Sequence, residues 1–468
     1  PRKRHTRPHT STRSGIAAAS SAELPRPPMA IVAAAPFREA PDDVVDEILL
    51  RLPCPSSLVR AAAACASFRL LVSSPRFLRR HRALHPGAAA PFLGVFSSVP
   101  APGDSGGAFH PSDPPHPAAA AARDVAGAAD FSFAFLPAPP DAATGAERPG
   151  WLVRDYRDGR FLLDRASSCS TFDSDIVTDL AVCDPLSRRY VLLPPIPEDL
   201  AASANNPLGV LGGRRWCEPF LAPADAEGDK DEEEPSFVVI WTARCPRKVV
   251  ALAFSSREGQ WRALPSPDCF VWRRHRSPFS CPVHAVWNRR HYAHGRFYWA
   301  DCLTNRWLVL DIGAMELSVQ EVPAPARFWE ENVVVVEGAD GEVGVFAHDF
   351  YHANGNASLN YYTIPHEVDG AAKSWRLEKT IPLPWSTAHG RPFCIRGAAN
   401  GCLIIEVNQD SPRPFMSSSH DSRDVELFKI DVGRLELERV CRARCSGGVS
   451  DGWWPYFGFP PLLSLPTV

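Results

Sequence analysis

The apolar and polar positions divide the chain into a short helical part and a long strand-rich part. Between residues 39 and 85, apolar residues recur every three or four positions, as Val44, Ile48 and Leu52 do. This is the spacing of an amphipathic helix. Pro53 ends the first helix, and the pattern then resumes, which predicts three or four short helices in all. In the rest of the chain apolar and polar residues alternate, as in strands.

A hairpin unit recurs along the strand-rich part. Apolar strands end at Asp184, Asp311 and Asp431, and each is followed by a short polar turn and a second strand. Ser255 takes the equivalent position in a fourth hairpin. Aspartate suits this position because its carboxylate accepts hydrogen bonds from the backbone amides of a tight turn. The strands before the hairpins contain glycine, as in DGRFLL, HGRFYW, DGEVGVF and NGCLII.

This repeat predicts the architecture of the strand-rich part. The hairpins begin roughly 50–70 residues apart, and two hairpins make one four-stranded blade. Such units cannot bury their faces alone, so we expect a closed β-propeller of five to seven blades. Closure would pair the C-terminal segment near Phe457 and Phe459 with the first strand near Phe92. The alternative is an irregular β-sandwich. The predicted fold class is α+β and multidomain, a small helical domain followed by a mainly antiparallel β domain.

Composition sets the domain boundaries. We predict a disordered leader at residues 1–38, a helical domain at 39–85 and a β-rich domain at 131–468. Residues 86–130 are predicted to form one strand and a flexible linker or loop rich in Pro, Gly and Ala. The acidic run DAEGDKDEEE, which ends at Glu234, is typical of solvated surface.

The overall charge and the cysteines indicate which partners and which cellular compartment to expect. The 468 residues carry a net charge of −3, which gives no general attraction to nucleic acid or to anionic membranes. No apolar run approaches the ~20 residues that cross a bilayer. The 13 cysteines are scattered singly and form no CxxC pair, and many lie in apolar runs, as Cys183 does. They are typical of a reducing compartment, so we expect the protein in the cytoplasm, the nucleus or both.

Motifs for catalysis are largely missing. The chain has no GxGxxG, P-loop or HExxH motif. The string GDSGG contains Ser105, but it lies in a Pro/Gly-rich stretch without a suitably placed histidine before it. His291 and His294 have a spacing that also occurs by chance. We therefore expect no catalytic residue, no cofactor and no metal.

The helical part resembles an F-box. The pattern includes an acidic pair, an apolar helix that ends in Arg-Leu-Pro, then Leu-Val-Arg, a cysteine, an aromatic residue and Pro-x-Phe. The matching residues are Pro41, Asp42, Asp43, Glu47, Ile48, Leu49, Arg51, Leu52, Pro53, Leu58, Val59, Arg60, Cys65, Phe68, Pro75 and Phe77. Ala40 stands where leucine is usual, Ala66 where a basic residue is common and Phe68 where tryptophan is usual. These departures would weaken the affinity for an adaptor but keep the apolar face.

The strand-rich part resembles the F-box-associated β-propeller region of plant F-box proteins. The stretch VCDPLSRRYVLLPPIP at residues 182–197 carries this likeness most strongly. The two resemblances imply a non-catalytic substrate receptor of an SCF-type cullin–RING ubiquitin ligase. Its F-box would bind a Skp-type adaptor, and through it a cullin, while the β domain would bind an unknown target protein. The residues that the resemblance assigns to the adaptor are Pro41, Val44, Val45, Ile48, Leu49, Leu52, Pro53, Leu58, Val59 and Phe68.

Two alternatives stay open at this point. The chain could be a propeller binding module with a vestigial F-box outside any ligase. It could also be a carbohydrate-active propeller enzyme, which would show a cluster of acids at one mouth of the domain.

Overall fold

The computed structural model describes most of the helical part and the strands of the β-rich part. The described ranges are 41–85, 91–97, 107–137, 151–165, 179–204, 217–223, 236–245, 248–266, 290–301, 306–321, 333–338, 341–348, 356–364, 375–386, 393–407, 422–446 and 453–457. The predicted leader, the acidic run, Ser105 and Phe459 lie outside these ranges. Residues from Asp46 onward form one compact unit, and residues up to Val45 belong to another.

Four short helices form the N-terminal helical part. They are α2 (Asp42–Leu50), α3 (Pro55–Ala64), α4 (Ala66–Val72) and α5 (Pro75–Leu84). Proline occupies the first turn of α3 and of α5, where a missing amide costs nothing. The hydroxyl of Ser74 accepts a 3.2 Å hydrogen bond from the Phe77 amide and so caps α5.

The end of α2 is held by histidines from α5. The Nε2 atoms of His85 and His81 lie 2.9 Å from the carbonyl oxygens of Leu50 and Leu52. Leu50 is the last residue of α2 and Leu52 follows the helix, so the contacts give partners to carbonyls at the open helix end and bind α5, with His85 directly after it, to α2.

The strands form six antiparallel sheets, five of them four-stranded. Their sheet orders are β2-β1-β23, β3-β4-β5-β6, β10-β9-β8-β7, β11-β12-β13-β14, β15-β16-β17-β18 and β19-β20-β21-β22. The bounds are β1 (Phe92–Ser97), β2 (Ala108–Pro111), β3 (Leu152–Arg157), β4 (Arg160–Asp164), β5 (Leu180–Asp184), β6 (Arg189–Leu192), β7 (Cys217–Ala222), β8 (Val238–Arg244), β9 (Val249–Ser255), β10 (Gln260–Ala263), β11 (His291–Ala293), β12 (Arg296–Asp301), β13 (Arg306–Asp311), β14 (Glu316–Glu321), β15 (Val333–Glu337), β16 (Val343–His348), β17 (Asn356–Ile364), β18 (Arg376–Ser386), β19 (Phe393–Ala399), β20 (Cys402–Val407), β21 (Ser422–Asp431), β22 (Glu436–Ser446) and β23 (Trp453–Phe457).

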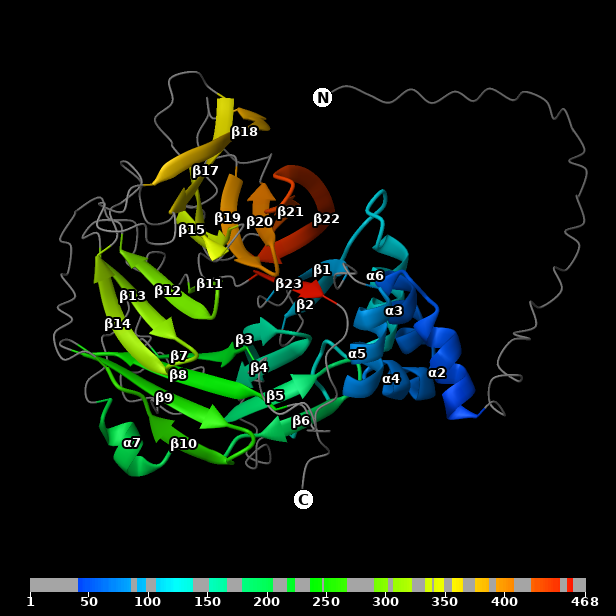
Figure 1. Ribbon diagram of the computed structural model, residues 1–468, viewed down its shortest axis with the longest axis horizontal. Helices are drawn as coiled ribbons and strands as arrows, with labels where there is room; N and C mark the ends of the chain where they lie inside the picture. The colour runs from blue at the N-terminus through cyan, green and yellow to red at the C-terminus, as the bar shows by residue number, and fades with distance from the viewer. Residues whose placement is uncertain are drawn as a thin grey trace, which may run out of the picture. The chain divides into compact units, whose positions relative to one another are not determined.

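The sheets are the blades of a six-bladed β-propeller (Figure 1). Contacts between blades join β3 with β7, β11 with β15, β15 with β19, β19 with β23, and β23 with β3, so these strands surround the axis. β1 pairs with β23, and Phe92 lies opposite Phe457. The expected closure of the C-terminal segment onto the first strand is therefore confirmed, and the β-sandwich alternative is excluded.

The turns explain both sequence signals of the repeat. The amides of Leu186, Ala314 and Arg434 donate to the Oδ1 atoms of Asp184, Asp311 and Asp431 at 2.9, 3.0 and 2.9 Å, as expected for aspartate at these hairpins. The glycines lie in a different turn, between the first two strands of a blade. Asp158 and Gly159, His294 and Gly295, and Asn400 and Gly401 all have positive φ. A two-residue hairpin of type I′ requires this conformation twice, and glycine adopts it without strain.

The segment predicted to be a linker is partly folded. Residues 108–111 form β2, and α6 (Ala119–Ala128) follows it and packs against α3. The prediction of a flexible linker over 86–130 is wrong for this part. Composition misled because alanine-rich sequence is also a good helix former, and Ala121, Ala122 and Val125 are buried.

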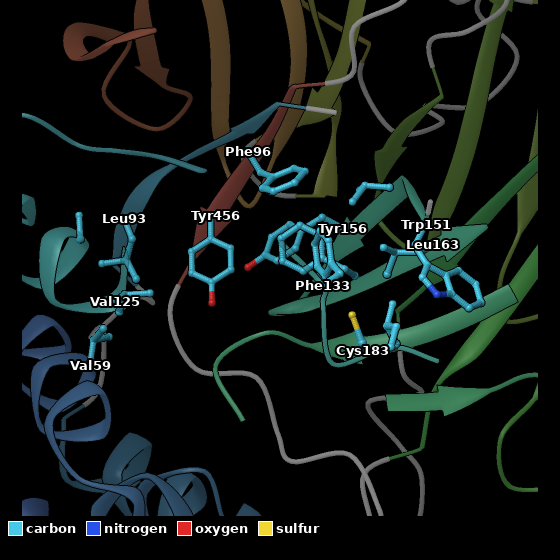
Figure 2. Close-up of a cluster of buried hydrophobic side chains, with 14 of the residues drawn as sticks. Val59, Leu93, Phe96, Val125, Phe133, Trp151, Tyr156, Leu163, Cys183 and Tyr456 are labelled. Carbon is cyan, nitrogen blue, oxygen red and sulfur yellow. The ribbon is translucent and has the colours of Figure 1, made fainter. Parts of the chain in front are cut away.

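One buried cluster joins the helices to the propeller. Figure 2 shows it running from Val59 on α3, past Val125 on α6 and Leu93 on β1, to aromatic rings near the first blade. The ring of Phe96 lies 5.0 Å from that of Phe161 in an edge-to-face contact. Because this core is continuous, α3 and the propeller are expected to unfold together.

The predicted burial of cysteine is confirmed at Cys183, which is fully buried and whose thiol pKa is raised by that burial. Among the described residues no helix is both long enough and apolar enough to cross a membrane.

A buried tyrosine provides a test of ring closure. The Tyr156 hydroxyl donates to the Phe457 carbonyl at 2.9 Å and accepts from the Phe457 amide at 3.1 Å. Burial raises the pKa of this hydroxyl, so it remains protonated. We predict that Tyr156→Phe lowers the free energy of unfolding by about 1–3 kcal/mol, because two backbone groups lose their buried partner. Urea denaturation measures this.

The matched control is Tyr190→Phe. Tyr190 is half-buried and makes a ring contact with Phe135. Its substitution should change the stability by less than about 0.5 kcal/mol. Equal stability of the two variants would contradict the role of Tyr156 in closing the ring.

Candidate functional site

The structure separates the ten residues predicted to contact an adaptor into three groups. Pro41, Val44, Ile48 and Pro53 are exposed, and Leu52 and Phe68 are half-buried. Val45, Leu49, Leu58 and Val59 are buried. A side chain that is already buried contributes to internal packing and has little surface to offer a partner. The exposed aliphatic side chains of α2 are Val44 and Ile48, which are 46% and 43% exposed.

Two further exposed aliphatic residues were not predicted. Leu70 on α4 is 49% exposed and Leu84 on α5 is 60% exposed. Six large hydrophobic side chains are exposed in the described ranges: Val44, Ile48, Leu70 and Leu84 on α2–α5, Leu192 on β6 and Leu377 on β18. Exposed aliphatic side chains are more frequent on these helices than on the described strands.

Ion pairs hold the helices in place. Arg80 on α5 pairs with both Asp46 and Glu47 on α2. Arg60 on α3 pairs with Asp124 on α6 at 2.9 Å, with side chains that are 58% and 44% exposed. An exposed pair of this kind contributes at most about 1 kcal/mol. The buried packing of Val59 therefore dominates the junction between α3 and α6.

A second polar cluster lies at the axis, where three blades meet. Arg290, directly before β11, pairs with Asp155 on β3 at 2.7 Å and with Glu218 on β7. Its guanidinium lies over the ring of Phe220, with the central carbon 4.1 Å from the ring centroid. These residues come from positions far apart in the sequence, and no local pattern identified them.

Both carboxylates in this axial cluster have their oxygens occupied. The second oxygen of Asp155 accepts from the Leu221 amide at 2.8 Å, and the second oxygen of Glu218 accepts from Trp299 Nε1 at 3.3 Å. A general acid or base must be able to exchange a proton with a substrate. The observed bonds instead suit a structural connection between three blades.

The histidine pair also has a structural explanation. His291 is buried, and His294 lies in the β11–β12 turn with its Nε2 2.7 Å from the Glu342 carbonyl oxygen. The His294 amide donates to Glu337 Oε1 at 3.1 Å. Across the ranges that the structure describes, no group of three or more His, Cys, Asp or Glu residues is placed to hold a metal ion.

Comparison with known proteins adds little to this description. No protein-family model and no curated protein matches the chain. Among solved structures, the α-L-arabinanase of Penicillium chrysogenum is 11% identical with a TM-score of 0.30, covering 63% of this chain and 93% of the other. An oligogalacturonate lyase is 10% identical with a TM-score of 0.28, covering 61% and 64%. The NanB sialidase of Streptococcus pneumoniae is 11% identical with a TM-score of 0.26, covering 58% and 36%. Likenesses this weak say nothing of activity, and the propeller assignment rests on the sheet topology.

The axial cluster leads to a stability prediction. Arg290→Gln leaves the two carboxylates of Asp155 and Glu218 without their counter-charge in a largely buried place. We expect the free energy of unfolding to fall by about 3–5 kcal/mol. Thermal or chemical denaturation of the full chain measures the loss.

Arg296→Gln is the control, since it removes the same charge from the more exposed pair of Arg296 with Asp311, whose side chains are 45% and 33% exposed. Its cost should be no more than about 1 kcal/mol. A small, equal effect of both substitutions would show that the axial cluster does not connect the blades.

Proposed function

We propose that this protein is the substrate-receptor subunit of an SCF-type cullin–RING ubiquitin ligase. Its helices α2–α5 would bind a Skp-type adaptor, and its propeller would bind the target protein. In this role the chain performs no chemistry. It brings the target close to the ubiquitin-charged enzyme, and proximity supplies the rate enhancement. We expect it to act in the cytoplasm or the nucleus.

The exposed aliphatic side chains of the helices carry this proposal. Val44 and Ile48 lie one helical turn apart on α2, the helix whose sequence resembles the start of an F-box. Exposed aliphatics gain free energy when a partner removes them from water. The sequence pattern supplies the identity of that partner, a Skp-type adaptor.

The junction of α3 with α6 fits a receptor role. Val59 and Val125 belong to the same buried core as the first blade. A receptor that joins its two binding surfaces through a packed core holds the target at a set distance from the adaptor. The two surfaces are therefore less independent than a flexible linker would make them.

The axial carboxylates favour a binding role over a hydrolytic one. A propeller glycosidase needs two acids that act on a sugar. Asp155 and Glu218 are bound to Arg290 and to neighbouring donors. This arrangement supports the proposal that the propeller recognises a protein and does not cleave a carbohydrate.

Substitution of Ile48 tests the adaptor contact. Ile48→Asp places a charge on an exposed position, so the fold should be retained. Burial of an isoleucine is worth about 1.5–3 kcal/mol, so adaptor affinity should fall by at least about tenfold. A pull-down with purified Skp-type adaptor measures the loss, and circular dichroism confirms folding.

The control is Leu377→Asp on β18, which places the same charge at a site that is 52% exposed. It should bind the adaptor as the unsubstituted chain does. If Ile48→Asp retains full adaptor binding, the F-box assignment is wrong.

A matched pair of valines separates binding from packing. Val59 is 2% exposed and Val44 is 46% exposed. Val59→Ala should lower the free energy of unfolding by about 1–3 kcal/mol because it opens a cavity in the core. Val44→Ala should change it by less than about 0.5 kcal/mol and weaken adaptor binding instead. Denaturation measures the stability of both variants, and a pull-down measures their adaptor binding. If Val44→Ala destabilised the fold and Val59→Ala only weakened adaptor binding, the assignment of Val44 to the surface and Val59 to the core would be wrong.

A further inference from the structure

Arg157, at the end of the axial strand β3, is held in a fixed orientation. Its Nε donates to the Leu221 carbonyl on β7 at 3.2 Å. Its guanidinium carbon lies 4.3 Å from the centroid of the Tyr292 ring and 5.3 Å from that of Phe297. Residues of two other blades, Leu221 on β7 and the rings on β11 and β12, thus hold the guanidinium, and these contacts do not use its two Nη groups.

The Nη groups of Arg157 have no protein partner in the described part of the chain. None of the hydrogen bonds or ion pairs among these residues involves them, and they are not among the buried polar atoms that lack a partner. The residue as a whole is half-buried. Arg290 differs in this respect, because Asp155 and Glu218 occupy its nitrogens.

The charge of Arg157 is incompletely balanced. Burial lowers the pKa of its guanidinium, and the like charge of Arg290 acts in the same direction. Asp155 and Asp158 oppose this shift, but neither lies within ion-pair distance, and Asp155 is already paired with Arg290. Arginine stays protonated, so an added anion here would lower the electrostatic free energy.

We propose that the Nη edge of Arg157 binds one oxyanion of the target protein, either a carboxylate or a phosphate group. The planar fork of arginine matches both groups, because two parallel N–H donors meet two oxygens. The Tyr292 ring and the Leu221 carbonyl orient the fork before the ligand arrives, which reduces the entropy lost on binding. This inference rests on the proposed role of the propeller as the target-binding domain.

Small anions test the site before any target is known. Inorganic phosphate and acetate are titrated against the full chain at constant ionic strength with chloride as the balancing ion, and the melting temperature is followed. We expect a saturable rise in melting temperature, since a ligand that binds only the folded state stabilises it. Arg157→Gln should abolish the saturable rise, and Arg296→Gln, which removes an equal charge from an exposed pair, should retain it.

Arg157→Lys is the second variant and serves even if Arg157→Gln does not fold. It keeps the charge but loses the fork, so the affinity should fall by roughly tenfold or more. Tighter binding of phosphate than of acetate would indicate a phosphorylated target residue, and the reverse an acidic side chain. The proposal is overturned if the unsubstituted chain shows no saturable rise, or if Arg157→Gln or Arg157→Lys binds as tightly.

Adaptor binding is measured on the same variants. It should be unchanged by Arg157→Gln, because Arg157 is on β3 and the adaptor residues are on the helices. If Arg157→Gln loses anion binding but retains adaptor binding, the inference is supported. A chain that binds anions through Arg157 but never binds adaptor would refute the proposed function alone.

Discussion

The pairing of β1 with β23 is the contact on which the rest of the structure depends. A propeller blade buries its faces only against its neighbours, so an open ring would expose two apolar faces and two unpaired strand edges. The chain closes the ring by placing strands from its two ends in one sheet, with Phe92 opposite Phe457. Tyr156 on the neighbouring blade then bonds both backbone groups of Phe457. Closure is therefore secured by a sheet ladder and by a side chain from the next blade.

The same closing sheet also connects the helices to the propeller. β1 contributes Leu93 and Phe96 to the core that contains Val59 of α3 and Val125 of α6. α6 thus lies between a helical module that is too small to be stable alone and a ring that needs its first strand covered. Within the unit from Asp46 onward, α3 and the propeller therefore share one packed core.

Two arginines near the axis have different partners for their charge. At the axis, Arg290 has two carboxylates and an aromatic ring as partners, so its interactions are directed inward and join blades. Arg157 has a carbonyl and two rings as partners, and no carboxylate among the described residues forms an ion pair with it. Both arginines contact the Phe297 ring, but only Arg290 joins blades through ion pairs. The proposed anion contact uses Arg157.

The sequence by itself determined the local features. Hydrophobic periodicity predicted the helices, the aspartates at strand ends predicted the hairpins, and the pairing of residues near Phe92 and Phe457 followed from the need to close a repeat. The glycines recurred in the sequence, but only the structure showed that they form a second kind of turn. These signals are local or periodic, so they survive without knowledge of the fold. Only the tertiary structure decided which apolar residues of α2 are exposed, because Val45 and Leu49 have the same four-residue spacing as Val44 and Ile48 but are buried. It also decided the folded state of α6 and brought Asp155, Glu218 and Arg290 together from three blades. Burial and long-range pairing depend on what packs against each face, and that information is spread over the whole chain.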